Sequence, residues 1–214
     1  MTPADAAKFE EKTLSRKDIF SGHVIQVKLD TVAIPDGSPD QTREIALHPG
    51  GVAILALTQE GKIILVRQFR KALEEVIYEI PAGKIDPEER AKLELTKNGS
   101  VHSGFHGENA ETSKTLLKAI RRELEEETGY KAAEIHQVAE FYVSPGFTNE
   151  KTYLFFATGL TKVEHPKPAD VGEILELHEV TLDEALKLVR KGEIDDAKTL
   201  IALQYIQLQD INHG

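Results

Sequence analysis

The sequence predicts an α/β fold in which helices flank a mixed β-sheet, with a small N-terminal β-meander ahead of it. Three observations support this prediction. Short β-prone runs separated by turns fill the first part of the chain, and β-prone and helical segments then follow one another to the end. Apolar residues also recur at helical spacing at Leu116, Leu117, Ile120 and Leu124. This mixed order of strands and helices favours a mixed sheet covered by helices.

Residues 1–48 are predicted to form a β appendage, and residues 49–214 the main domain. The turn Pro35–Pro39 separates a first group of β-prone runs from a further strand at Thr42–Leu47. The sequence His48-Pro49-Gly50-Gly51 then marks the boundary. The apolar residues of the first group are Val24, Val27, Leu29, Val32 and Ile34.

The main domain begins with two predicted strands, Val52–Thr58 and Lys62–Gln68, which the short turn between them suggests are a hairpin. Proline and glycine predict irregular backbone at Glu79–Gly83. An amphipathic helix is expected at Ser113–Thr128, ended by Gly129.

The remaining elements follow in order. Strands are predicted at Ala139–Tyr142, Thr152–Thr158 and Ile174–Val180. Two helices complete the domain, at Leu182–Lys191 and Ala197–Leu208. Thr181 with Glu184 three residues later is a capping box that should open the first of them.

Composition narrows the classes of function. The 214 residues carry a net charge of −10, which disfavours broad nucleic-acid binding because that needs a basic surface. Cysteine is absent, so disulfides, zinc–thiolate sites and thiol nucleophiles are excluded. No signal peptide or membrane-length apolar run is seen, and we expect a cytoplasmic protein without a membrane partner.

An acidic stretch within the predicted helix is the strongest functional signal. Glu123, Glu126 and Glu127 stand at i, i+3 and i+4 and therefore point to the same side of a helix. Carboxylates this close repel one another unless a cation lies between them, and Mg²⁺ prefers such oxygen ligands. The alternative is a solvated acidic helix face, which is common in a chain with 36 acidic residues.

The flanking residues favour the metal site. The run from Arg122 to Tyr130 resembles the second half of the signature box of the Nudix hydrolases, and Gly83–Glu89 resembles the first half. The family pattern has seven residues between the halves, whereas 32 residues lie between Glu89 and Arg122 here. This chain therefore has a 25-residue insertion, at about 90–114, relative to the pattern. Within it, His102 and His106 have metal-ligand spacing, but nearby glycines argue against the helix this spacing would need.

The resemblance implies a Nudix-type α/β/α sandwich and assigns roles to box residues. Glu123 and Glu127 match the principal ligands of Mg²⁺ or Mn²⁺, and Glu126 matches a third carboxylate that binds or orients. The backbone carbonyl of Ala82 matches a further ligand. Arg122 matches the arginine that orients a neighbouring glutamate through a charge-assisted hydrogen bond, although a simple ion pair on the helix surface is the alternative.

Outside the box the chain resembles the ADP-ribose pyrophosphatase branch of the family. The resemblance rests on Gln68–Arg70, Glu79–Gly83, the Ser144-Pro145-Gly146 loop and the late segment Gly192–Thr199. It implies hydrolysis of ADP-ribose to AMP and ribose 5-phosphate by a homodimer. The substrate would be a small nucleoside diphosphate, contacted by Arg70, Gly83, Pro145 and Gly146, while Glu79 would contact it directly or brace the pocket. The alternative for Arg70 is an exposed arginine at a strand end. The alternatives are hydrolysis of other nucleoside diphosphate sugars or dinucleoside polyphosphates, or a sensor that binds ADP-ribose without cleaving it.

The sequence leaves the general base open. Members of this branch often carry a Glu-x-Glu pair in a late loop, where the first glutamate activates water. In this chain Val171 occupies the first position and Glu173 the second. Glu173, Glu150 or a box glutamate such as Glu126 therefore remain as candidates, and a base must come within hydrogen-bond reach of the water. The alternative for Glu150 and Glu173 is that they are solvated loop acids.

Overall fold

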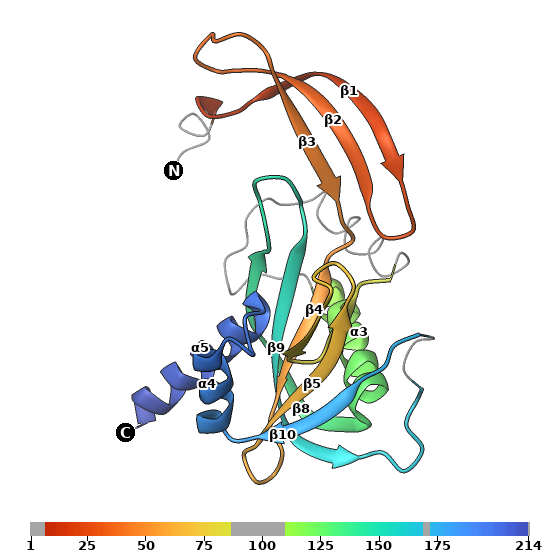
Figure 1. The fold of residues 1–214 in the computed structure, drawn as a ribbon, viewed down its shortest axis with the longest axis vertical. Helices are drawn as coiled ribbons and strands as arrows, with labels where there is room; N and C mark the ends of the chain where they lie inside the picture. The colour runs from red at the N-terminus through yellow and green to blue at the C-terminus, as the bar shows by residue number, and fades with distance from the viewer. Residues whose placement is uncertain (1–6, 87–109, 169–171, 214) are drawn as a thin grey trace. The chain divides into compact units, whose positions relative to one another are not determined.

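The computed structural model describes the backbone of residues 7–86, 110–168 and 172–213 (Figure 1). The chain divides into two compact units, Met1–Gly50 with Tyr142–Lys151, and Gly51–Phe141 with Thr152–Gly214. Glu89, His102, His106 and Val171 lie outside the described residues. Within the described part, no helix is both long enough and apolar enough to cross a membrane.

The first unit contains the predicted meander. Strands β1 (Lys12–Ser21), β2 (Gln26–Ala33) and β3 (Gln41–Leu47) form an antiparallel sheet in that order. The turn between β2 and β3 places Gly37 at a φ of 80°, a conformation that favours glycine. Asp30 on β2 is buried and accepts two hydrogen bonds of 2.6 Å from Arg16 on β1, which ties the first two strands together.

A second segment, Tyr142–Lys151, also belongs to the first unit. The backbone amide of Ala46 donates to the carbonyl of Phe147 at 2.8 Å, and Ala46 pairs with Thr148 in a parallel bridge. The backbone amide of His48 donates to the side chain of Asn149 at 2.8 Å. These bonds attach the Ser-Pro-Gly loop to the end of β3, a link that the sequence boundary at residue 48 did not anticipate.

The second unit contains two sheets. The first has the order β7-β4-β9-β8. Strand β4 (Gly51–Ala56) runs parallel to β9 (Lys151–Lys162) and antiparallel to β7 (Ala82–Lys84). Strand β8 (Tyr130–Tyr142) lies at the end of this order opposite to β7. In the second, β5 (Ile63–Arg70) lies between β10 (Glu176–Val180) and β6 (Glu75–Glu79). Parallel and antiparallel pairs thus coexist, and the predicted mixed sheet is confirmed.

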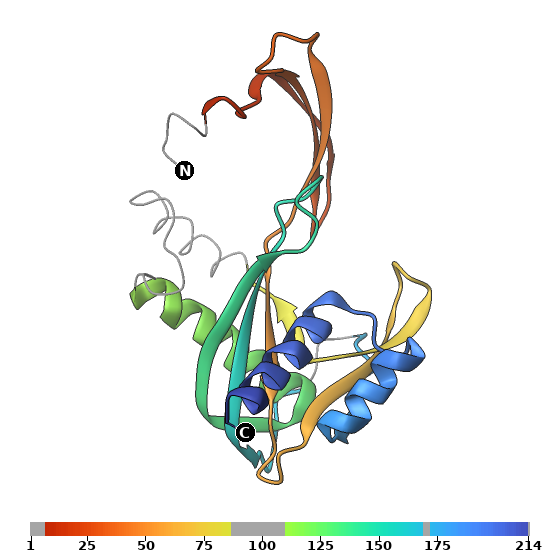
Figure 2. The ribbon, with the colours of Figure 1, turned by 90° about the vertical axis from the view of Figure 1, so that its left-hand side faces the viewer.

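Alternation along β4 places it between two layers of helix. Val52, Ile54 and Ala56 pack in one core cluster with α3 (Ala110–Thr128), whereas Ala53 and Leu55 pack in another with residues of α4 (Leu182–Lys191) and α5 (Ala197–His213). A strand buried on both faces needs apolar residues at successive positions, as this sequence provides. Figure 2 shows α3 and α5 on opposite sides of the sheet that contains β4.

The helix ends follow the predicted signals. Gly129 ends α3 at a φ of 70°, and its amide donates to the carbonyl of Glu125 at 2.8 Å. Thr181 and Glu184 form the expected capping box of α4, and Gly192 closes that helix in the left-handed conformation. Helix α5 begins at Ala197 as predicted and extends to His213, beyond the expected end.

Two predictions of local structure were wrong. The hairpin between residues 52–58 and 62–68 continues only as far as one bridge, Leu57 with Ile63, after which β4 and β5 enter different sheets. β4 and the first half of β5 are buried on both faces, so their apolar runs did not reveal their partners. The irregular segment expected up to Gly83 is also shorter, because Ala82–Lys84 pairs with β4.

Candidate active site

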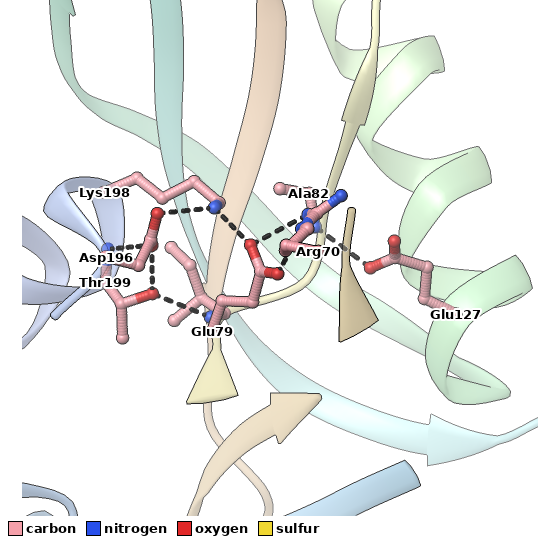
Figure 3. A network of polar contacts seen from close by, with 8 residues as sticks. Arg70, Glu79, Ala82, Glu127, Asp196, Lys198 and Thr199 are labelled. Carbon is pink, nitrogen blue, oxygen red and sulfur yellow. Dashed lines mark hydrogen bonds and ion pairs between the residues drawn. The ribbon is translucent and has the colours of Figure 1, made fainter. Parts of the chain in front are cut away.

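Helix α3 presents two acidic side chains to the edge strand β7. Glu123 and Glu127 are both buried although they carry carboxylates. Glu127 Oε2 accepts a hydrogen bond of 3.0 Å from the backbone amide of Ala82 (Figure 3). The structure therefore brings the two predicted principal ligands to the loop that was predicted to supply the backbone ligand.

Gly83 shows how closely Glu123 approaches this strand. A Cβ atom added at Gly83 would lie 1.9 Å from the carboxyl carbon of Glu123 and within 2.3 Å of both carboxyl oxygens. No side chain fits at that distance, so glycine is required here to admit the carboxylate. Gly83 was predicted as a substrate contact, and its observed neighbour is a box glutamate.

The backbone of β7 directs the Ala82 carbonyl to the same edge. The carbonyl of Pro81 faces β4, where it accepts from the amide of Ile54 at 2.9 Å. Backbone groups of successive residues face opposite edges of a strand, and in an antiparallel pair a residue exchanges both of its bonds with its partner or neither. Since the Ala82 amide donates to Glu127, the Ala82 carbonyl also faces the edge of β7 that points away from β4. This geometry supports its predicted role as a ligand.

Glu127 lies in an environment that disfavours its charge. Burial raises the pKa of Glu127 to about 8; the hydrogen bond from the Ala82 amide opposes this, and the charges of Glu123, Glu173 and Glu79 add to it. A cation at this position would favour the ionised carboxylate instead. The repulsion expected from the sequence pattern is therefore present in the folded protein.

Arg122 joins the carboxylates on its own helix. Its Nη1 atom lies 2.9 Å from Glu123 Oε1 and donates to Glu126 Oε2 at 3.1 Å, and its Nη2 atom lies 3.5 Å from Asp86 Oδ2. Burial opposes the charge of Arg122, but these acidic neighbours together raise its pKa. Arg122 is thus placed to orient Glu126 and Glu123, which is the geometry expected of the box arginine.

The donor set fits a hard divalent cation. In the described residues no three histidine, aspartate or glutamate side chains form a metal cluster by themselves. Mg²⁺ is, however, usually held by one or two carboxylates together with water and substrate phosphates, not by an all-protein cage. Glu123, Glu127 and the Ala82 carbonyl, which come together at one strand edge, suit that mode of binding.

Glu79 is the centre of a second polar network beside this edge. It is 1% exposed and accepts hydrogen bonds of 2.6 and 2.8 Å from Nε and Nη2 of Arg70. Lys198 Nζ donates to the same carboxylate and, at 2.9 Å, to Asp196 (Figure 3). Glu79 thus holds the positively charged side chains of Arg70 and Lys198 in place. Arg70 is 39% exposed on its side chain, so it remains accessible to a ligand.

The sequence did not single out Asp196, Lys198 and Thr199 as site residues. They open α5, where the carboxylate of Asp196 accepts from the amide of Thr199 at 3.0 Å and from its hydroxyl at 2.6 Å. The Thr199 hydroxyl in turn accepts from the amide of Ile80 at 3.0 Å. The sequence does show Asp196 two residues before Lys198-Thr199 at the start of a predicted helix, but nothing in it connects these residues to Glu79.

The other predicted site residues are Glu173, Pro145, Gly146 and Glu150. Glu173 is exposed, and its charge acts on Glu127. Pro145, Gly146 and Glu150 belong to the first unit, where Glu150 Oε1 lies 3.6 Å from His48 Nδ1. Their roles stay predictions.

Comparison with known proteins adds to this geometry. The NUDIX domain model matches residues 47–203. The chain is 45% identical to the ADP-ribose pyrophosphatase of Bacillus subtilis (strain 168) over 201 residues, which are 94% of this chain and 95% of that protein. It is 42% identical, with the same shares covered, to the methanol dehydrogenase activator of Bacillus methanolicus. It is 32% identical to the GDP-mannose pyrophosphatase of Cronobacter sakazakii (strain ATCC BAA-894), with 79% of each protein covered.

A solved structure also shares the fold. The crystal structure of an ADP compounds hydrolase superposes with a TM-score of 0.73 and covers 96% of both chains at 17% identity. The α/β/α sandwich expected from the sequence is therefore confirmed.

Proposed function

The chain belongs to the NUDIX family, and from this premise we propose that it is a Mg²⁺-dependent hydrolase of ADP-ribose. Water would cleave the diphosphate linkage, so that one P–O bond to the bridging oxygen breaks and AMP and ribose 5-phosphate leave. The 45% identity to an ADP-ribose pyrophosphatase over nearly the full length supports this choice of substrate.

One observation carries the proposal. Two buried carboxylates, Glu123 and Glu127, lie against the backbone of Ala82 and Gly83 at an edge that the Ala82 carbonyl also faces. Burying carboxylates is costly. The pKa of Glu127 is raised to about 8, so its hydrogen bond from the Ala82 amide does not offset this cost. Such an arrangement is reasonable where a cation is part of the working site.

The chain's own residues take distinct roles in this proposal. Glu123, Glu127 and Ala82 would hold Mg²⁺ (Mn²⁺ is an alternative), and Arg122 orients Glu126, a third carboxylate. When bound, the ion would neutralise phosphate oxygens and lower the pKa of a bound water. Arg70, whose planar group suits phosphate oxygens, would contact the diphosphate while Glu79 fixes its position.

Glu173 is the candidate we favour for the general base. Glu173 is exposed, and its charge contributes to the raised pKa of Glu127, which supports a place for it beside the proposed ion. Glu126 is engaged by Arg122 and Glu150 by His48. A substitution Glu173→Gln should lower kcat more than it changes KM if Glu173 takes the proton from water.

Product analysis tests the proposed function. The purified full-length chain is incubated with ADP-ribose, GDP-mannose or a dinucleoside polyphosphate, with and without Mg²⁺, and the products are identified by chromatography. AMP and ribose 5-phosphate, formed only with Mg²⁺, are the expected products. Turnover of GDP-mannose alone would reassign the substrate, and tight ADP-ribose binding without turnover would indicate a sensor.

A second candidate function rests on the 42% identity to a methanol dehydrogenase activator. This similarity favours an effect on a dehydrogenase in addition to hydrolysis. The test is the rate of methanol oxidation by such a dehydrogenase with and without this chain. An unchanged rate would rule the second function out.

The partners proposed are a small nucleoside diphosphate and a second copy of the chain. The homodimer is proposed because the sheet of the first unit exposes the large apolar side chains Leu14, Ile19 and Phe20. The cytoplasmic location expected from the sequence stays a prediction.

A further inference from the structure

We propose that the first turn of α5, through Thr199 and Lys198, positions the Ala82 backbone that faces the carboxylates of α3. The proposal rests on the proposed function only for the chemistry of the site. The contacts that support it are made between residues of the protein and involve neither metal nor substrate. Thr199 and Lys198 are therefore positioning residues and do not contact the reacting atoms.

The Thr199 hydroxyl is fixed in both of its hydrogen-bonding roles. It donates to Asp196 Oδ2 at 2.6 Å and accepts from the backbone amide of Ile80 at 3.0 Å. Thr199 is fully buried. Since the donated bond sets the direction of the hydroxyl proton, a lone pair remains directed at Ile80.

Lys198 grips the preceding residue of the same segment. Its ammonium group contacts the carboxylate of Glu79, the last residue of β6, and lies 2.9 Å from Asp196 Oδ1. Two neighbouring residues of α5 thus hold two neighbouring residues, Glu79 and Ile80, and Asp196 supports both.

The contacts at Ile80 affect Ala82 because a single residue, Pro81, separates the two. Pro81 follows Ile80 and has a fixed φ, and its carbonyl bonds the amide of Ile54 on β4 at 2.9 Å. Ala82 comes next and donates to Glu127. A shift at Ile80 therefore moves the Ala82 peptide relative to Glu127, because little freedom lies between them.

The alternative is that Thr199 and Lys198 only stabilise the fold. Buried threonines that cap or bridge are common, and their loss lowers stability anywhere in a protein. The two roles differ in one respect. A positioning role changes the affinity for the metal, whereas a general stabilising role leaves that affinity unchanged at temperatures where the variant is folded. Amide exchange at Ile80 accelerates in both cases, because the Thr199 hydroxyl is its acceptor, so exchange reports only that the contact is lost.

The test compares two substitutions at Thr199 with a matched control. Thr199→Val keeps the shape but removes the hydroxyl, and Thr199→Ser keeps the hydroxyl. Thr58→Val is the control, because Thr58 is also buried and its hydroxyl also accepts a backbone amide, that of Lys62, at a turn outside the site. Mn²⁺ binding to the metal-free full-length protein is measured by calorimetry, and amide exchange of the segment 79–83 by mass spectrometry.

Thr199→Val is expected to weaken Mn²⁺ binding by about 10-fold or more, as supporting residues around metal sites do. Amide exchange of 79–83 should accelerate in the same variant. Thr199→Ser should restore both readouts, and Thr58→Val should leave both at the wild-type value. If Thr199→Val does not fold, Lys198→Met removes the neighbouring contact and is expected to move both readouts in the same direction.

The inference is overturned if Thr199→Val, or Lys198→Met in its place, binds Mn²⁺ as tightly as the wild type, whatever the exchange in 79–83. It is also overturned if Thr58→Val weakens Mn²⁺ binding equally. A wild-type protein that fails to hydrolyse ADP-ribose would contradict the proposed function alone, because neither readout needs the substrate.

Discussion

The backbone amide of Ala82 donates a hydrogen bond to Glu127 at 3.0 Å, across 45 positions of sequence. This bond joins the edge strand β7 to the acidic helix α3. It brings the carbonyl of Ala82, the carboxylate of Glu127 and, against Gly83, the carboxylate of Glu123 to one edge. We expect this edge to hold the metal ion.

Glu127→Gln should lower the hydrolysis of ADP-ribose by about 100-fold or more. Substitution of residues that only support metal ligands lowers metal affinity or activity by about 10–100-fold, and loss of a ligand should lower activity by at least the upper value. Glu125→Gln is the matched control, because Glu125 is on the same helix and equally buried but lies 3.6 Å from Lys131. Steady-state rates at saturating Mg²⁺ give the comparison. Equal losses in both variants would argue against a metal role for Glu127.

Gly83→Ala should abolish most activity while the protein stays folded. The added Cβ overlaps the carboxylate of Glu123, whose flexible side chain can swing away and so leave the β7 edge. Circular dichroism and thermal unfolding report the fold, and Mn²⁺ titration reports the site. Wild-type Mn²⁺ affinity in Gly83→Ala would contradict the placement of Glu123.

Tyr130 should make the free energy of unfolding depend on pH in the alkaline range. Burial, together with the hydrogen bond that the hydroxyl donates to Glu179 at 2.8 Å, raises the pKa of Tyr130 to about 12. Because this exceeds the unfolded value of about 10, the stabilisation is complete below pH of about 10 and is lost as the pH rises through about 12.

Tyr130→Phe removes this pH dependence and should cost about 1 kcal/mol of unfolding free energy at neutral pH. Urea unfolding across the alkaline range measures both effects. Tyr142→Phe is the control, since Tyr142 is 58% exposed. An unchanged alkaline stability profile in Tyr130→Phe would show that the hydroxyl contributes nothing.

The double substitution Ile19→Asp with Phe20→Asp should convert a dimer to a monomer. Both side chains are more than half exposed on β1, and aspartate there would place charge in an apolar interface. Light scattering should give twice the chain mass of 23.8 kDa for the wild type and the single mass for the variant. A monomeric wild type would contradict the homodimer.

Much of the fold could be predicted because local signals were strong. The helix periodicity around Ile120, the left-handed stop at Gly129 and the capping box at Thr181 all hold in the structure. The pairing of β4 could not be predicted. Its residues are apolar at every position, so the pattern that identifies a buried strand contains no information about its neighbours.

The site was predictable to the extent that it lies on one helix. Glu123 and Glu127 share a face by helical geometry, and the resemblance pointed to Ala82. The contacts of Glu79 with Arg70 and Lys198 were not predictable, because Lys198 lies 119 positions away and reaches Glu79 only through the packing of α5. The contact between the buried Tyr130 on β8, whose hydroxyl donates a hydrogen bond, and Glu179 on β10 was not predictable either.

The position of the metal ion can be located by the anomalous scattering of Mn²⁺ in crystals of the full chain grown with a non-hydrolysable ADP-ribose analogue. We predict an ion bound by the carboxylates of Glu123 and Glu127 and by the carbonyl of Ala82, in contact with the diphosphate. An ion bound elsewhere, with Glu127 still accepting the Ala82 amide and Glu123 still against Arg122, would contradict this prediction.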